Sequence, residues 1–282
     1  MDCIPANPEL SQELTALKFP GMTANWANAN FRFQMNQTPA IPLIPFSFTL
    51  QLGGESLSIS GTVPATECPV TDLIPLLLSL GEGVVAAASR QVPSGKPISC
   101  GPGCGACCRQ LVPISLSEAA YLRHEVLPNL PDDHRLRIKL RLADAASILR
   151  TSGLLGELQA LPAQTDPARR QAVGLRYFLG GIPCPFLEQE SCSIHPQRPL
   201  ACREYLVVSP VPRCSRPDHG GIESVPIPNK PSHALIQLDA AATRSPGWRT
   251  MIEALADDAV VPVRTVPDSI QFLKNFLAML LK

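Results

Sequence analysis

The chain has 282 residues, of which 45% are hydrophobic and 17% are charged, and this composition excludes a wholly disordered protein. Its 24 basic and 24 acidic side chains balance, which argues against a nucleic-acid-binding protein held by bulk phosphate attraction, because that attraction needs a basic face. Ten cysteines and 30 prolines are the unusual features.

Residues 1–97 are predicted to form an N-terminal region built around a β-hairpin. Apolar and polar side chains alternate from Phe46 to Leu52 and again from Leu57 to Val63. Gly53-Gly54 lies between the two runs, and a glycine pair is typical of a tight turn. The pattern predicts two antiparallel strands with one buried face.

Two helices are expected in the same region. Asn7-Pro8 has the residue types of a helix start, which predicts a short helix there. Thr71-Asp72 is expected to cap a longer apolar helix that runs to about Ser89. The most apolar part, Leu73 to Ala88, is interrupted by Pro75 and is predicted to be too short to cross a bilayer.

Residues 98–215 hold eight of the ten cysteines and are predicted to form a helical, metal-binding cysteine-cluster domain. Ser115 to Glu118 has the pattern of a capping box, which predicts a helix to Val126. A second helix is expected after Pro131, and a third from Asp166-Pro167 to Gly180-Gly181. The second helix is predicted to bury the apolar side chains Leu136, Leu140, Ile148 and Leu149.

Residues 216–282 are predicted to be a proline-rich linker followed by helices near 233–243, 247–257 and 268–281. The chain as a whole is therefore predicted to be α+β and mostly α-helical. No basic n-region followed by an apolar run opens the sequence, so a soluble cytoplasmic protein without a membrane partner is expected. In a reducing compartment, clustered cysteines are metal-binding or catalytic more often than they are disulfide-bonded.

Two groups of cysteines have the spacing of metal ligands. The first is Cys100-x3-Cys104-x2-Cys107-Cys108, and the second follows about 75 residues later. Thiolates two or three residues apart can wrap one soft metal ion or cluster, and the glycines at 101, 103 and 105 suit such a loop. We predict a zinc ion, an iron ion or an iron–sulfur cluster held by Cys100, Cys104, Cys107, Cys108, Cys184, Cys192 and Cys202.

Arginines accompany these cysteines, and they allow two interpretations. They could offset the negative charge of the thiolates. They could equally pair with surface carboxylates such as Glu188 and Glu204. The four arginines concerned are Arg109, Arg198, Arg203 and Arg213.

The remaining candidates are weaker. His195 could be a ligand or an ordinary loop histidine, and Cys214 lies past the compact motif, so both are left open. Cys3 and Cys68 are isolated in the sequence and are expected to be ordinary thiols.

The cysteine motifs resemble those of the bacterial YkgJ-type CxxCxxCC cysteine-cluster family, which is described as a zinc- or iron-chelating domain. The resemblance covers about residues 98–206, and the sequence departs from the family at two positions. The first gap has three residues where the family has two, so the family pattern supports Cys100 less than the others. His195 stands where the family usually has tyrosine, so no ligand role is inherited there. The matching segments are Cys100 to Arg109, Cys184-Pro185-Phe186-Leu187, Cys192-Ser193-Ile194-His195 and Arg198 to Arg203.

Three functions are consistent with these observations. The first is a metal-binding protein with a cysteine-ligated zinc or iron–sulfur centre. The resemblance implies the second, an iron–sulfur-dependent modifying enzyme similar to flagellin lysine N-methylase, which contains a similar cysteine cluster. The third is a protein-interaction module supported by structural zinc, in which the hairpin edge accepts a strand of a protein partner.

The sequence does not identify a catalytic residue, and it does not distinguish zinc from iron. The spacing C-x3-C-x2-C also occurs in radical S-adenosylmethionine enzymes. Those enzymes usually alternate strands and helices after the motif, whereas helix after helix is expected here. We therefore treat that match as a coincidence of spacing.

Overall fold

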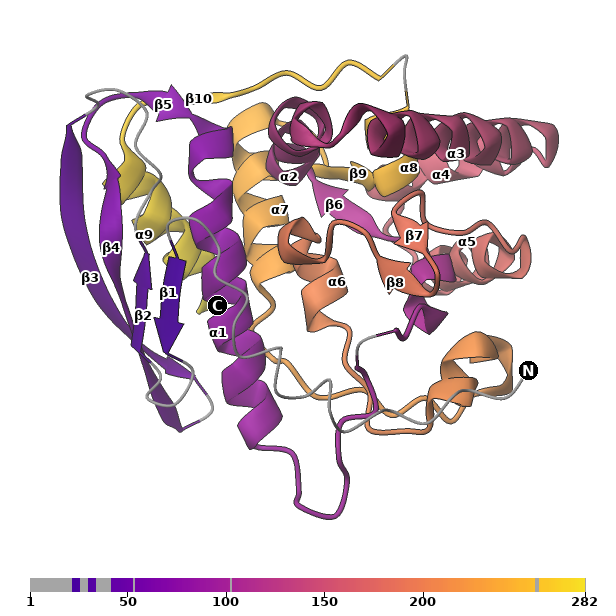
Figure 1. The fold of residues 1–282 in the computed structure, drawn as a ribbon, viewed down its shortest axis with the longest axis horizontal. Coiled ribbons are helices and arrows are strands. Elements are labelled where there is room, and N and C mark those ends of the chain that lie inside the picture. Colours follow the sequence, from indigo (N-terminus) through magenta and orange to yellow (C-terminus); the bar gives the residue numbers. More distant parts are fainter. Residues whose placement is uncertain are drawn as a thin grey trace.

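The computed structural model describes residues 22–25, 30–33, 42–52, 54–101, 103–256 and 259–281. A four-stranded sheet lies at one side of the molecule, and helices make up most of the rest (Figure 1). The predicted α+β, mostly helical class is confirmed. The helix predicted at Asn7-Pro8 and the isolated Cys3 lie outside the described residues.

The predicted hairpin is the larger half of the sheet. β3 and β4 run antiparallel with Leu50 opposite Leu57, and the strand order is β1-β2-β4-β3. The sequence pattern missed β1 and β2, and β2 pairs with β4 in parallel. The four strands are β1 (Met22–Asn25), β2 (Asn30–Phe33), β3 (Leu43–Leu52) and β4 (Glu55–Pro64).

The helices account for most of the remaining chain. Ser115 and Glu118 form the predicted capping box, and Asp166 caps the third helix of the cysteine region as expected. The helix expected at 247–257 is shorter than predicted, because a strand occupies its first residues. The helices are α1 (Ile74–Arg90), α2 (Leu116–Tyr121), α3 (Asp132–Thr151), α4 (Leu154–Ala160), α5 (Pro167–Leu179), α6 (Leu200–Glu204), α7 (Pro231–Thr243), α8 (Met251–Leu255) and α9 (Ser269–Leu280).

Short strand pairs connect distant parts of the chain. β5 pairs with β10, and β6 pairs with β9, so the C-terminal segment lies against both preceding segments. The boundaries at 97 and 215 stay a prediction. The short strands are β5 (Cys68–Pro69), β6 (Pro113–Ser115), β7 (Leu187–Glu188), β8 (Ser191–Cys192), β9 (Trp248–Thr250) and β10 (Thr265–Val266).

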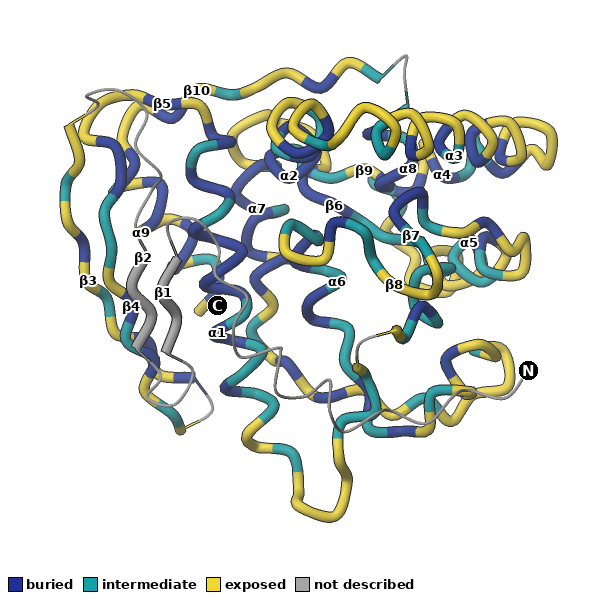
Figure 2. The backbone as a smooth tube through the Cα atoms, viewed as in Figure 1, coloured by how far each residue is buried: buried dark blue, intermediate teal, exposed yellow. Residues whose placement is uncertain are grey.

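α1 is the central helix of the largest hydrophobic cluster (Figure 2), where it packs with the sheet, α7 and α9. The helical segment Val70–Arg90 has 21 residues and is long and apolar enough to cross a membrane by length and composition, with 72% of its apolar window buried inside the protein. The prediction that it is too short is wrong, because Pro75 occupies the first turn, where proline does not interrupt a helix. Thr71 and Asp72 precede the helix without capping it.

α3 buries a different stripe from the one predicted. Leu136, Leu140 and Ile148 are 58%, 57% and 45% exposed, so three of the four expected core positions are wrong. Leu149 is buried, as are Ile138, Leu142, Ala145 and Ala146. Positions 136 and 138 are two residues apart and therefore point to nearly opposite sides of a helix.

Candidate metal centre

The fold brings the cysteine-bearing segments together beside α6, β7 and β8 (Figure 1). Cys107 and Cys108 lie on η5, a single 3-10 turn (Ala106–Arg109). The Cys184 N–H donates to the Cys108 carbonyl at 2.6 Å, which joins the two halves of the motif. Cys192 lies on β8, and Cys202 lies on α6.

Cys100 is held close to the segment that follows α6. The Ser99 N–H donates to the Val207 carbonyl at 2.9 Å, and the Val207 N–H donates to Cys100 Sγ at 3.4 Å. The Cys104 N–H closes a turn onto the Gly101 carbonyl at 3.2 Å. The start of the first cysteine group therefore lies beside the segment that follows Cys202.

Two of the three predicted loop glycines have a structural reason to be glycine. Gly103 has φ +78°, in the left-handed region that glycine tolerates best. A Cβ at Gly105 would lie 2.6 Å from Glu190 Oε2 and 2.8 Å from Leu187 Cδ1, so η5 packs directly against the β7–β8 turn. Gly101 meets neither condition.

Five thiols form what we call the inner thiol group. Burial, followed by the charges of the neighbouring thiolates, raises the pKa of Cys184 to about 12 and that of Cys202 well above its usual range. A hydrogen bond with Cys108 lowers the pKa of Cys107 to about 7 and raises that of Cys108. Such a set cannot carry several negative charges unless a cation joins it. The inner thiol group is Cys107, Cys108, Cys184, Cys192 and Cys202.

Three more thiols adjoin this group through Cys107, and we call them the outer thiol group. Cys214, which the sequence left open, is buried on η10 (Val211–Ser215), and η10 packs against η5. Burial and the charges of Cys100, Cys104 and Cys107 raise the pKa of Cys214. The only sequence signal for Cys214 was its Arg213-Cys214 pair. The outer thiol group is Cys100, Cys104 and Cys214.

Other thiol and imidazole candidates differ from these. Cys68 lies on β5 with its Sγ 3.4 Å from Ser269 Oγ, apart from both groups. Desolvation and the positive charges of Arg198 and Arg203 lower the pKa of His195 to about 4, so its ring is neutral near pH 7. None of the nine cysteines in the described part of the chain forms a disulfide.

Arg198 is the arginine that best fits a role beside an anionic centre. Its Nε is buried and has no hydrogen-bond partner among the described residues. Its positive charge lowers the pKa of Cys107 and acts against the burial that raises the pKa of Cys192 and Cys202. An unpaired buried donor next to thiols that lack a cation fits a thiolate-ligated metal, whose excess negative charge the donor would offset.

The other three arginines have partners away from the thiols. Arg109 pairs with Glu190 at 2.6 Å, and Arg213 donates to the Gly221 carbonyl at 2.8 Å. Arg203 is 2% exposed, pairs with Glu82 on α1 and donates to the Arg198 carbonyl at 2.9 Å.

Neither carboxylate suggested by the sequence is a partner of these four arginines. Glu188 pairs with Arg141 at 2.9 Å and with Arg137 at 3.3 Å. Glu204 is not on the surface: it is 8% exposed and accepts from the Ser232 N–H and Oγ, both at 2.6 Å. Burial raises the pKa of Glu204 to about 7.

The thiols gather but do not converge to bonding positions. Within the described ranges, no group of three or more His, Cys, Asp or Glu side chains is arranged so that it could hold a metal ion. A metal ion or cluster would therefore have to draw the sulfurs together. The seven-ligand assignment stays a prediction.

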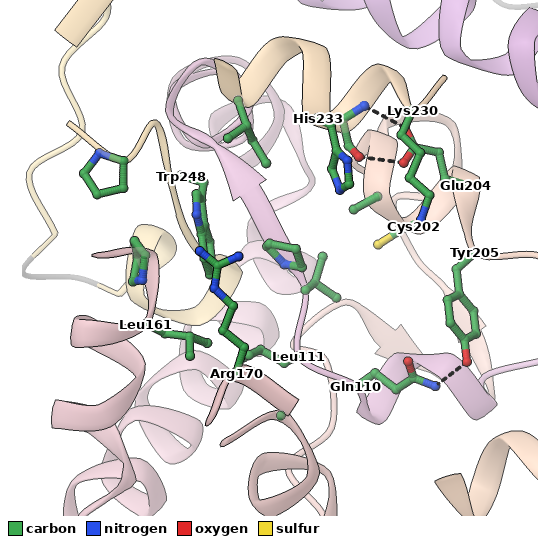
Figure 3. Close-up of a pocket in the computed structure, with 18 of the residues that line it drawn as sticks. Gln110, Leu111, Leu161, Arg170, Cys202, Glu204, Tyr205, Lys230, His233 and Trp248 are labelled. Atoms are coloured by element: carbon green, nitrogen blue, oxygen red, sulfur yellow. Dashed lines mark hydrogen bonds between the residues drawn. The ribbon is translucent and has the colours of Figure 1, made fainter. Parts of the chain in front are cut away.

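A cavity of about 790 Å³ opens beside the inner thiol group (Figure 3). Cys107 and Cys202 contribute to its lining. The sequence did not reveal this cavity, because its walls come from segments between positions 107 and 248 that only the tertiary fold brings together. Its other polar and aromatic lining includes Arg170, Tyr205, Lys230, His233 and Trp248.

Comparison with known proteins agrees with the cysteine geometry. Residues 99–217 match the family model CxxCxxCC, described as "Putative zinc- or iron-chelating domain". No curated protein and no solved structure matches the chain. The match covers less than half of the chain and supports a zinc- or iron-chelating domain over residues 99–217.

Proposed function

We propose that the inner thiol group binds zinc or iron, the latter as an ion or as an iron–sulfur cluster. The observation that carries this proposal is that five thiols come together from three separate segments, with the Cys184 N–H bonded to the Cys108 carbonyl. The Arg198 Nε beside them has no partner among the described residues. Thiolates are the ligands that these metals share. When bound, the metal supplies the positive charge that the clustered thiolates lack. Thiolate ligation requires reduced cysteines, and we propose the cytoplasm as the compartment.

The chain's own residues would hold and shape the site. Cys107, with the lowest pKa of the group, is the first thiol to ionise. Arg203 ties the 196–198 loop to α1 through Glu82, and so it fixes the position of Arg198. Glu118 accepts the Leu200 N–H at 2.7 Å and thereby anchors the start of α6, which carries Cys202.

Metal content of the anaerobically purified full-length chain tests the proposal. We expect at least one zinc or iron per chain by mass spectrometry, with a visible absorption spectrum recorded beside it. Cys184→Ser and Cys202→Ser should each lose most of the metal, and Cys68→Ser, which alters a thiol apart from the cluster, should retain it. A metal-free wild-type protein, or folded inner-group variants that keep full metal content, would overturn the proposal.

The number of thiols bears on the type of centre. Eight thiols in the two groups exceed the four that one tetrahedral zinc needs. One four-iron cluster with spare cysteines, or two centres that meet at Cys107, would use them. A Cys214→Ser variant separates these cases: loss of one of two metal equivalents indicates a second centre, and unchanged content assigns the metal to the inner group alone.

The cavity favours a second candidate function, an iron–sulfur-dependent modifying enzyme. Structural zinc sites are closed to ligands, whereas Cys107 and Cys202 line an open cavity. We expect such an enzyme to be brown when prepared without oxygen, with absorption in the visible range. A colourless protein that contains zinc alone would exclude this version and favour a structural zinc that supports a protein-interaction module.

A further inference from the structure

The cavity beside the inner thiol group has walls from several separate segments of the chain (Figure 3). Arg170 comes from α5. Lys230 directly precedes α7, and His233 lies in the first turn of α7. Trp248 comes from β9, and Cys202 comes from α6. A volume of about 790 Å³ lies in the range of small-molecule sites.

Two permanent cations line this cavity and form no salt bridge within the described part of the chain. None of the ion pairs formed by the described residues includes Arg170 or Lys230. Arg170 Nε donates to the Gln164 carbonyl at 2.5 Å, and no described residue accepts from its two terminal nitrogens. A guanidinium with free terminal donors is well suited to a carboxylate or a phosphate.

The negatively charged side chain in the cavity lining already accepts hydrogen bonds from the protein. Glu204 is the one carboxylate among the described lining residues, and both of its oxygens accept hydrogen bonds from Ser232. Glu204 lies near Lys230, whose charge acts against the burial that raises the pKa of Glu204, whereas Arg170 lies on the opposite wall. The cavity consequently has an excess of positive charge.

The rest of the lining suits an apolar body. Trp248 presents an aromatic ring, and Leu111, Leu161 and Ile236 add aliphatic surface. Aromatic faces bind planar groups by stacking and apolar contact. A ligand that satisfies the whole cavity must combine a negative charge with an apolar or aromatic portion.

We infer that this cavity binds a small organic anion, a carboxylate or phosphate carried by an apolar or aromatic body. Arg170 and Lys230 attract the anionic group from two walls of the cavity, and Trp248 offers its ring to the body. Cys107 and Cys202 in the lining place such a ligand next to the proposed metal centre. Only this last relation to the metal rests on the proposed function, since the anion contacts themselves do not require a metal.

A fluorescent organic anion tests the inference directly. The chain has two tryptophans, so a Trp26→Phe background leaves Trp248 as the sole indole reporter. We expect 1-anilinonaphthalene-8-sulfonate to bind the full-length protein at about one equivalent and to quench Trp248. Arg170→Gln and Lys230→Gln should each weaken binding about 3- to 10-fold, as expected for the loss of one charged contact.

Matched controls separate a local contact from bulk charge. Arg169→Gln removes the neighbouring arginine of the same helix, and Lys274→Gln removes an exposed lysine of α9, and neither residue lines the cavity. Both controls should bind the dye with an affinity within about twofold of that of the Trp26→Phe protein, because surface charges contribute little. Thermal unfolding of every variant checks that the dye is not reporting a loosened fold.

Competition identifies the anion. Displacement of the dye by benzoate indicates a carboxylate ligand, and displacement by phenyl phosphate indicates a phosphate ester. Displacement by neither compound, or dye affinity that Arg170→Gln and Lys230→Gln leave unchanged, overturns the inference. Metal content is measured on the same samples, so a metal-free protein with Arg170-dependent dye binding refutes the proposed function and keeps this inference.

Discussion

Arg198 shows how one side chain distinguishes a metal centre from a group of buried thiols. Its Nε is buried without a partner among the described residues, and its charge favours the thiolate form of four cysteines, Cys100, Cys107, Cys192 and Cys202. The energetic cost of burying this unpaired donor is offset when a negatively charged centre forms beside it.

Arg198→Gln should therefore weaken metal retention. We expect the affinity to fall about 10- to 100-fold, as for other residues that support metal ligands, and Arg198→Lys to recover part of the loss because it restores the charge. Competition with a chromophoric chelator measures the affinity.

Arg213→Gln is the matched control for this change, because Arg213 also adjoins a cysteine but donates to the Gly221 carbonyl. Its metal affinity should stay close to that of the wild type. Equal effects of the Arg198 and Arg213 substitutions would show that only general positive charge matters.

Glu118 gives a pH-dependent prediction. Its two oxygens accept from the Ser115 N–H at 3.0 Å and from the Leu200 N–H at 2.7 Å. Burial raises its pKa above the usual 4.5, so the folded protein holds this proton more tightly than the unfolded chain. The stability that Glu118 contributes is complete below pH 4.5 and falls as the pH rises through the raised pKa.

Glu118→Gln should destabilise the fold by about 1–3 kcal/mol, because the amide keeps only one acceptor for two N–H donors. The variant does not titrate at this position, so the difference in free energy of unfolding should narrow as the pH rises. Urea unfolding at several pH values measures this difference. Glu67→Gln, at an exposed position, is the control and should change the free energy of unfolding by close to zero. A difference that is constant or widens with pH would contradict the sign of this shift.

At the scale of elements, close packing of η5 on the β7–β8 turn holds the two halves of the cysteine motif together. Gly105→Ala places a Cβ 2.6 Å from Glu190 Oε2 and 3.1 Å from its Cα, so the backbone must move. We expect a loss of about 1–3 kcal/mol in unfolding free energy together with reduced metal content. Gly101→Ala, with nothing within 4 Å, should change neither quantity, and equal loss in both variants would point to loop flexibility instead.

Elements with local signals could be predicted from the sequence, and those that depend on tertiary contacts could not. The capping box at Ser115, the cap at Asp166 and the alternation in β3 and β4 are local and correctly placed helices and strands. The parallel pairing of β2 with β4 depends on a distant strand. The exposed leucines of α3 show the same limit, because a helix with apolar residues on several sides does not reveal which side meets the core.

At the scale of the whole molecule, the candidate site was only partly visible in the sequence. Spacing marked the cysteines within each group as neighbours, because residues on one short loop are necessarily close, and their role as ligands stays a prediction. The approach of Cys214 to η5, the unpaired Nε of Arg198 and the cavity all depend on packing between distant segments. The eight thiols of the two groups lie outside the largest hydrophobic cluster, although α6 packs on α1 and places Leu200 in that cluster.

That separation predicts an uneven response to metal removal. The largest hydrophobic cluster joins the sheet, α1, α7 and α9, and among its buried residues in the described part of the chain the one cysteine is Cys68. Cys184 and Cys192 instead pack against the second cluster, beside Phe186 and Ile194. Chelation should therefore lower the melting temperature and loosen the cysteine-bearing segments 99–110 and 184–204, while most of the helical circular dichroism stays intact.

Hydrogen exchange followed by mass spectrometry, with and without chelator, locates the change. We expect faster exchange at 99–110 and 184–204, and unchanged protection in α1, α7 and α9. Cys68→Ser treated in the same way is the control, since its thiol is buried in the core that should not respond. A uniform loss of protection would mean that the metal supports the whole fold, and identical exchange with and without chelator would remove its structural role.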